Sequence, residues 1–389
     1  MNDTMILNEF PSTDDFYKTY WGKKPFIVRG AIDQDLFDDL IDGDSLAGLS
    51  LEEEIKSRLV ITEPENNKWI CHHGPFPEDK FSTLGDSNWN LLVQNVEQYH
   101  PETAQLLSAF NFSPRWLMDD IMVSYSATGG SVGPHTDSYH VFLVQGMGKR
   151  KWKIGHSPIE NQEYIDDTDL LVLKHGFEGY ETEVSIGDVI YIPPHFGHQG
   201  ITTQEAMTFS VGFLGPQRSE LFAEYSHYLE QHPHINKRYT GQGLDANSAA
   251  FSIAPSATNI IQNDLIEAIK DERFSTWMAE YFSIPTHDSF QNATAETNHI
   301  SSADLLEMLQ SGEVLCRPEH IKLAITRSVD GSTNIAGYSG TLMVPAKHEK
   351  LIHWLNNNHK ISIDDLDNKE LITLVTHLYN NGILSFNDI

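Results

Sequence analysis

Between about residues 92 and 214, short hydrophobic runs alternate with turns that contain glycine and proline. The runs are rich in Val, Ile, Tyr, Phe and Thr, the residue types that favour β-strands. Many short strands with few helices between them predict an antiparallel barrel or a double-sheet jelly roll. The clearest predicted strands are Ile121 to Ser126, Tyr139 to Gln145, Lys151 to Ile154, Val189 to Ile192 and Met207 to Phe213.

After Pro216 the hydrophobic residues recur at helical spacing, which predicts helices over Ser219 to Gln231 and over Asn259 to Phe282. These helices carry more aromatic residues than one small buried face needs. Packing into the core of a single chain explains any one of them, and an interface between two copies explains the group. The aromatic residues concerned are Tyr225, Tyr228, Phe274 and Trp277.

A segment rich in Ser, Thr, Asn and Pro, residues 285–299, is predicted to be a linker. Beyond it we expect an amphipathic helix, a strand, a second helix near Leu351 to Leu355, and a last helix that ends at Asn381-Gly382 before a short strand. Helices followed by a hairpin suggest a winged-helix domain over 300–389. Its 7 Lys and Arg against 11 Asp and Glu have the wrong sign for binding DNA, so we interpret it as a protein-interaction or structural module.

Charge and cysteine content limit the partners and the compartment. Lys and Arg number 26 and Asp and Glu 55, which gives a formal net charge of −29. Such a surface repels nucleic-acid phosphates and attracts basic partners, although solubility alone would also explain it. The two cysteines form no C-x-x-C pair, the N-terminus lacks the pattern of a signal peptide, and no run approaches the ~18 apolar residues of a membrane span. We therefore expect a cytoplasmic protein that binds neither membrane nor DNA.

The stretch from Gly129 to Trp152 contains the strongest candidate for chemistry. His135 and Asp137 are two residues apart at the start of a strand, so their side chains leave the same face. A third ligand, His198, follows the strand that ends at Pro193-Pro194. Two histidines and one carboxylate that leave three adjacent positions open are typical of non-haem iron(II) oxygenases.

Each part of this pattern has an alternative. An isolated H-x-D is more often a loop histidine beside a capping aspartate. His100 and Glu102 form a competing His-x-acid pair, and His195 competes with His198 as the third ligand. The order of the parts favours the metal site: H-x-D, strand, turn, basic residues, a long gap, Gly-Asp, an apolar strand, Pro-Pro and then histidine.

The basic cluster Lys149-Arg150-Lys151 begins the strand after the turn. A buried Arg or Lys there could anchor the distal carboxylate of 2-oxoglutarate. Because side chains alternate along a strand, either Arg150 or the pair Lys149 and Lys151 points inward. Ser124 and Ser126, on one face of the preceding strand, could add a hydroxyl.

With these motifs the sequence resembles the JmjC-type (cupin-fold) 2-oxoglutarate oxygenases, and closely the bacterial ribosomal oxygenases. The resemblance covers nearly the whole chain, is highly specific in the predicted barrel and is loose beyond about residue 230. It implies a catalytic domain over 1–216, a helical dimerisation region over 217–284 and an acidic winged helix. The motifs that carry it are YWGKKPFIVRG (20–30), HGPF (73–76), DDIMVSYSATGGSVGPHTDSYHVFLVQGMGKRKW (119–152), GDVIYIPPHFGHQG (187–200) and SVGFLGP (210–216).

The resemblance also implies roles for single residues. It places Fe(II) on His135, Asp137 and His198, and the carboxylate of 2-oxoglutarate on Arg150 with help from Ser124, with dioxygen as the second cosubstrate. The implied substrate is an arginine of the sixteenth protein of the large ribosomal subunit, hydroxylated at its β-carbon. The residues that would hold the guanidinium are Asp120, Tyr139 and Ser210.

One position departs from the family pattern: His140 stands where the bacterial relatives usually carry an acid. Three other functions stay open. Human relatives hydroxylate histidine, so the target could be a histidine of a ribosomal or other basic protein. A cupin enzyme of another class would not need Arg150, and a DNA-binding regulator with a relic barrel would not need the intact triad.

Overall fold

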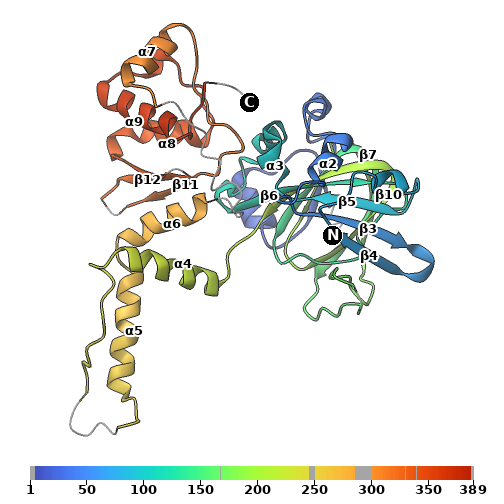
Figure 1. Cartoon of the computed structure of the whole chain (residues 1–389), viewed down its shortest axis with the longest axis horizontal. Coiled ribbons are helices and arrows are strands. Elements are labelled where there is room, and N and C mark those ends of the chain that lie inside the picture. The colour runs from blue at the N-terminus through green and yellow to red at the C-terminus, as the bar shows by residue number, and fades with distance from the viewer. Residues whose placement is uncertain are drawn as a thin grey trace. The chain divides into compact units, whose positions relative to one another are not determined.

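The computed structural model describes residues 5–166, 168–244, 250–284, 299–328, 330–338 and 340–386. These residues form two compact units with their boundary between Gly215 and Pro216, and each unit is described by itself (Figure 1). The predicted linker at 285–299 lies outside the described residues except for its last position. Among the described residues, no helix is both long enough and apolar enough to cross a membrane.

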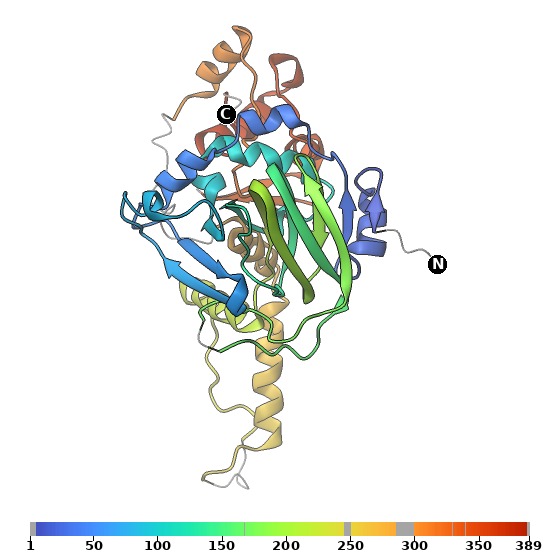
Figure 2. The ribbon, with the colours of Figure 1, turned by 90° about the vertical axis from the view of Figure 1, so that its right-hand side faces the viewer.

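The first unit is built on a ten-stranded sheet whose neighbours are antiparallel except for the first pair (Figure 2). The hydrogen-bonded order is β1-β2-β9-β7-β10-β6-β5-β3-β4, and β8 pairs with β7. The strands are β1 (Ile6–Leu7), β2 (Phe26–Val28), β3 (Ser57–Glu63), β4 (Lys68–His73), β5 (Trp89–Val93), β6 (Met118–Ser126), β7 (His140–Pro158), β8 (Gly179–Ser185), β9 (Val189–Ile192) and β10 (Phe196–Phe213).

The long strands β7 and β10 connect two halves of this sheet. The first part of β7 pairs with β9 and the later part with β8, while β10 pairs along both parts. The register shifts between Thr202 and Met207 mark the bend. At this bend Gly148 has φ +64°, and a Cβ there would lie 1.8 Å from the carbonyl oxygen of Glu205. The strand path has two ends, β1 and β4, so the fold is a jelly roll and not a closed barrel.

The predicted strands agree with this sheet, with one difference. The strand at Val189–Ile192 has the predicted bounds, and the runs at 121–126 and 207–213 lie inside β6 and β10. The two runs predicted at 139–145 and 151–154 belong to one continuous strand, β7. The glycines between them bend the strand without ending its pairing with β10.

Side chains of β7 divide between the core and the cavity described below. Phe142 and Val144 pack into the main hydrophobic core, while Val141 and Leu143 face the other side of the strand. That core is closed by short helical elements: α1 (Thr13–Asp15), α2 (Gly43–Leu49), α3 (Val96–Tyr99) and the 3₁₀ helix η5 (Pro101–Phe110).

The second unit combines helices with a three-stranded antiparallel sheet of order β11-β12-β13. In it α6 packs on β11 and β12, and the Thr326 hydroxyl donates to the carbonyl oxygen of Ser275 at 2.7 Å. The helical region and the C-terminal segment therefore share one compact unit. Its elements are α4 (Arg218–Gln231), α5 (Pro255–Ile269), α6 (Arg273–Ser283), α7 (Ser302–Gln310), β11 (Ala324–Arg327), β12 (Thr333–Gly337), β13 (Gly340–Val344), α8 (Glu349–Asn356) and α9 (Lys369–Asn380).

The three strands lie between α7 and α8, and among the described residues no regular strand follows Gly382. The short strand predicted there is reduced to an isolated bridge between Cys316 and Ser385. The winged-helix assignment therefore stays a prediction.

The helix predicted over Asn259 to Phe282 is two helices, α5 and α6. Asp271 separates them: its carboxylate accepts from the backbone N–H of Arg273 at 3.0 Å and from the Arg273 Nε at 2.6 Å. A side chain that bonds to the backbone two residues later competes with helix continuation, which explains the break.

The aromatic residues of these helices pack against one another within a single chain. Tyr225 and Trp277 are buried, with ring centroids 4.9 Å apart, and Phe274 lies 5.0 Å from Tyr225. The Tyr225 hydroxyl donates to the carbonyl oxygen of Ala268. Core packing accounts for these rings, so the aromatic pattern itself is no indication of a dimer.

Candidate active site

Backbone pairing brings the three predicted ligands together. His135 and Asp137 lie in the connection between β6 and β7, and His198 lies near the start of β10. The backbones of His135 and His198 exchange two hydrogen bonds, of 3.0 and 2.9 Å, and the N–H of His195 donates to the carbonyl oxygen of Asp137 at 2.7 Å. The connection therefore runs along β10 like a short additional strand.

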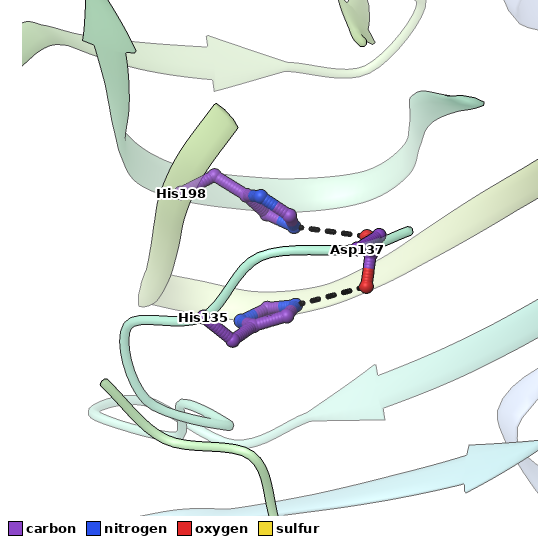
Figure 3. A group of neighbouring side chains, drawn as sticks. All are labelled: His135, Asp137 and His198. Carbon is purple, nitrogen blue, oxygen red and sulfur yellow. Dashed lines mark ion pairs between the residues drawn. The ribbon is translucent and has the colours of Figure 1, made fainter. Parts of the chain in front are cut away.

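The side chains of the three residues converge (Figure 3). The Nε2 of His198 lies 3.3 Å from one Asp137 carboxylate oxygen, and the Nε2 of His135 lies 4.0 Å from the other. Each imidazole directs its Nδ1 at a backbone carbonyl oxygen, of Gly133 at 3.0 Å and of Phe196 at 3.1 Å. Hydrogen bonding at Nδ1 places the proton there and leaves the Nε2 lone pair of each ring available to a metal.

The electrostatics suit a divalent cation. Burial, with the neighbouring charge of His198, lowers the pKa of His135 to about 4, so its ring is neutral at physiological pH. Burial raises the pKa of Asp137, but the hydrogen bond and charge of His198 outweigh burial and leave that pKa below its ordinary value. One ligand atom from each residue can be chosen so that all three lie within 4.8 Å of one another. Two imidazoles and a carboxylate on one side fit a non-haem iron(II) centre.

The competing histidines lie elsewhere. His195 is exposed, has φ +67°, and its ring nitrogen lies 3.3 Å from the Gln162 side-chain nitrogen. It contributes its backbone N–H to the site and directs its ring away. His100 pairs with Glu102 at 3.5 Å beside η5.

A cavity of about 310 Å³ opens from this cluster. All eight residues predicted for the site line it, although they come from different strands and a loop. They are Asp120, Ser124, His135, Asp137, Tyr139, Arg150, His198 and Ser210.

The structure decides which member of the basic cluster faces the cavity. Arg150 is 4% exposed and points inward. Lys149 and Lys151 point to the opposite face, where they pair with Glu183 and Glu181 of β8 at 3.9 and 2.8 Å. The pleat of β7 allows only this alternation.

Arg150 is a buried cation with no carboxylate partner among the described residues. It donates to the Thr208 hydroxyl and to the carbonyl oxygen of Gly200, both at 3.3 Å, and its Nε finds no partner in the part of the chain that the structure describes. Burial lowers its pKa to about 10, which still leaves it charged at neutral pH. A buried charge without a counterion fits an anionic ligand, and the hydroxyl of Ser124 lines the same cavity.

At a second position in the cavity wall, Asp120, Tyr139 and Ser210 lie around Gly212. A β-bulge between Val211 and Phe213 interrupts the pairing of β10 with β6 here. A Cβ at Gly212 would lie 3.4 Å from a carboxylate oxygen of Asp120 and 3.7 Å from the Tyr139 ring. Burial, followed by the charges of Asp137 and Asp120, raises the pKa of Tyr139, so its phenol stays protonated.

Sequence reasoning missed Glu97, which holds the backbone next to Asp120. β5 ends opposite Val123, and the N–H of Ile121 then donates to the Glu97 carboxylate at 2.8 Å instead of to a strand. Burial, then the charge of Asp120, raises the pKa of Glu97 to about 8. Nothing in the residue pattern indicated this role, because a short acidic helix beside a strand is common.

The departure at His140 does not concern the cavity. His140 lies on the core face of β7, stacks on Trp21 with ring centroids 3.5 Å apart, and places its Nδ1 2.8 Å from the Tyr191 hydroxyl. Burial lowers the pKa of its imidazole to about 4. His140 therefore makes packing contacts and is not among the residues that line the cavity around Asp120.

Comparison with known proteins agrees with this geometry. Residues 105–221 match the JmjC domain family. The chain is 31% identical to the ribosomal protein uL16 3-hydroxylase of Escherichia coli (strain K12), over 96% of this chain and 97% of that protein. It is 35% identical to a probable ribosomal oxygenase of Haemophilus influenzae, over 59% and 56% of the two chains. The structure of the Escherichia coli ribosomal oxygenase YcfD with cobalt and 2-oxoglutarate has a TM-score of 0.76 to this chain at 30% identity, covering 96% and 97%.

The raised pKa of Glu97 predicts a pH-dependent contribution to stability. The carboxyl stays protonated in the folded state up to about pH 8, whereas it ionises near 4.5 when exposed. The unfolded state therefore loses this proton first, and the free energy of unfolding should fall as pH rises between these values. In urea unfolding at a series of pH values, the free energy of unfolding should fall less steeply with pH for Glu97→Gln than for the wild type. Glu53→Gln, an exposed carboxyl of the same unit, should not change the slope; equal slopes for all three proteins would contradict the prediction.

Proposed function

This chain belongs to the JmjC-domain ribosomal oxygenases, and on that premise we propose that it is an iron(II)- and 2-oxoglutarate-dependent hydroxylase acting on an arginine of ribosomal protein uL16. The observation that carries the proposal is the content of one cavity. It holds a two-histidine, one-carboxylate cluster, a buried arginine to which the described part of the chain offers no counterion, and a separate carboxylate beside a phenol and a hydroxyl.

In this proposal His135, Asp137 and His198 hold the metal. Their Nδ1 contacts keep the imidazoles in the ligating tautomer, and the carboxylate contributes the charge that a divalent cation needs. When bound, iron(II) with 2-oxoglutarate and dioxygen supplies the oxidising power to hydroxylate a C–H bond, with succinate and carbon dioxide as by-products.

Arg150 anchors the distal carboxylate of 2-oxoglutarate, and Ser124 lies beside it as a hydroxyl donor. The guanidinium is fixed over the Trp152 ring at 4.9 Å and by its two long hydrogen bonds. A charge held in place without a counterion can pair with an incoming carboxylate at little cost of reorganisation.

Asp120, with Tyr139 and Ser210, receives the guanidinium of the substrate. A carboxylate offers two acceptors to a planar fork of N–H donors, and the neutral phenol and hydroxyl add orientation without further charge. The net charge of −29 supports the same substrate class, because an acidic enzyme attracts a basic ribosomal protein. Ribosomal proteins are made in the cytoplasm, where we expect this enzyme to act.

The proposal extends to a homodimer built on α5. Within the described residues this helix buries only Ala257, and it exposes Ile261, Leu265, Ile266 and Ile269. Four aliphatic side chains on one short helix form an apolar surface that a single chain leaves uncovered. The occupant we propose is the same surface of a second copy, which is the usual arrangement of a two-fold dimer.

The dimer proposal predicts that one charge on α5 shifts the oligomeric state. Leu265 is 58% exposed, so Leu265→Asp should leave the fold intact and convert the dimer to monomer in sedimentation velocity at micromolar concentration. Asn263→Asp introduces the same charge on the exposed polar part of the helix and should remain dimeric. A wild type that sediments as a monomer would remove the proposal.

The cosubstrate role of Arg150 predicts a selective effect on 2-oxoglutarate. In Arg150→Met the distal carboxylate loses its charged partner, so the KM for 2-oxoglutarate should rise by about ten-fold or more. Succinate formation measured against 2-oxoglutarate concentration gives this value. Lys151→Met, the neighbouring outward-facing position, is the matched control and should behave like the wild type. An unchanged KM in Arg150→Met would place the anchor elsewhere.

The substrate assignment is tested with a uL16 peptide and mass spectrometry. Removing one partner of a desolvated charge pair costs ~2–5 kcal/mol, so Asp120→Asn should lower hydroxylation of the arginine peptide by tens-fold or more. Succinate formation without peptide should persist, whereas Asp137→Ala should abolish both reactions and metal binding. A peptide with lysine at the target position should react poorly, because lysine lacks the planar fork. Equal reaction of the lysine peptide, or of a histidine peptide, would contradict guanidinium recognition while leaving the oxygenase assignment intact.

A further inference from the structure

Arg58 of β3 is a second cation in the cavity, and no role has yet been assigned to it. Among the described residues, the side chain of Arg58 has one hydrogen-bond contact, from Nη2 to the sulfur of Met122 at 3.8 Å, and forms no ion pair within 4.0 Å. Asp169, an acid that also lines the cavity, is engaged by His73 at 3.2 Å instead. A half-buried guanidinium with one weak sulfur acceptor has several N–H donors left for a ligand.

The position of Arg58 relates it to both the metal ligands and the proposed substrate site. Met122, which it contacts, lies two residues after Asp120 on the cavity face of β6. The charge of Arg58 also contributes to the electrostatic environment of His135, Asp137 and Tyr139. Arg58 thus lines the same cavity as the proposed metal ligands and contacts the strand that carries Asp120.

The chemistry of the proposed reaction limits what a cation can contact there. The C–H bond to be hydroxylated must lie beside the metal, and for the β-carbon of an arginine the backbone is one bond away. The peptide carbonyl groups at the target residue therefore enter the cavity near the metal ligands, while the guanidinium extends toward Asp120. Carbonyl oxygens are hydrogen-bond acceptors that a guanidinium fork can bind.

We propose that Arg58 donates hydrogen bonds to backbone carbonyl oxygens of the protein substrate at or next to the target residue. This inference rests on the proposed function and adds a second contact to it: Asp120 would select the side chain, and Arg58 would fix the backbone so that the β-carbon faces the metal. Arg58 would then be a substrate-binding residue that acts on position as well as affinity.

Removing the charge of Arg58 should change the affinity for a basic peptide in opposite directions through long-range electrostatics and through loss of a direct contact, so a binding measurement distinguishes the two. The chain carries a net charge of −29, so removing a positive charge increases its general attraction for a basic peptide. A direct hydrogen bond predicts the reverse, because the peptide carbonyl would lose a charged donor. Weaker peptide binding after removal of Arg58 can therefore come only from a short-range contact or from misfolding.

The experiment compares Arg58→Met, Arg58→Lys and the control Lys56→Met, which removes an exposed charge two residues earlier in the chain. The Kd of an arginine-containing uL16 peptide is measured by calorimetry on cobalt-loaded protein in the presence of 2-oxoglutarate, where no turnover occurs. The KM for the peptide and the KM for 2-oxoglutarate are measured on the iron-loaded enzyme. We expect Arg58→Met to weaken peptide binding by about 10- to 100-fold, with Arg58→Lys intermediate and Lys56→Met unchanged or slightly tighter. The KM for 2-oxoglutarate should change far less than the peptide Kd, because Arg150 and not Arg58 anchors the cosubstrate.

Three outcomes would overturn the proposal. Peptide binding by Arg58→Met as tight as wild type would exclude the contact, provided that the wild type hydroxylates the peptide. A higher KM for 2-oxoglutarate with unchanged peptide Kd would assign Arg58 to the cosubstrate carboxylate at the metal. A lowered melting temperature in both Arg58→Met and Arg58→Lys, with equal loss of every activity, would assign it to stability. If the wild type hydroxylates no uL16 peptide but still forms succinate, the proposed substrate is wrong, whatever the Arg58 variants do. If the wild type hydroxylates the peptide, only the comparison of the Arg58 variants with the wild type bears on the role of Arg58.

Discussion

The antiparallel ladder between β7 and β10 is the constraint on which the site depends. It runs along both halves of the sheet and carries Arg150 on one strand and His198, Thr208 and Ser210 on the other. The loop that contains His135 is attached to the same ladder by its backbone bridge to His198. A shift of this register by one residue would turn Arg150 to the solvent face and Lys149 and Lys151 inward, so the chemistry depends on pairing as strictly as the core does.

The cavity holds charges that the folded chain does not neutralise by itself. Arg150 and Arg58 have no carboxylate partners among the described residues, and the metal cluster has an imidazole on each side of its carboxylate. Uncompensated charge in a cavity lowers stability, and such strain is retained where a ligand relieves it. The arrangement is consistent with a site whose charge balance is completed only when cation, cosubstrate and substrate are all present.

Much of the first unit could be predicted from sequence because local signals agreed with the fold. Alternating Val, Ile and Phe located the strands, and the spacing of His135, Asp137 and His198 anticipated the cluster. The inward member of the basic cluster depended on the phase of the pleat, which the residue types did not determine. Contacts such as Ile121 with Glu97 were beyond reach, because they join segments whose approach is decided by tertiary packing. In the second unit, aromatic residues such as Tyr225 and Trp277 are common both in interfaces and in cores, so the sequence could not distinguish the two, and the structure buries both rings within the chain.

The bond from the Ile121 amide to Glu97 affects how this family can change. On the edge that faces β5, the wall beside Asp120 is held by a side chain and not by a strand, while its other edge pairs with β10. A strand partner supplies its carbonyl whatever residue it carries, so only rearrangement of the sheet can remove it. A side-chain partner can be exchanged by a single substitution while all ten strands stay paired. The wall proposed to bind the substrate can therefore change by single substitutions, whereas the proposed metal ligands are held together by backbone pairing that no single side chain provides.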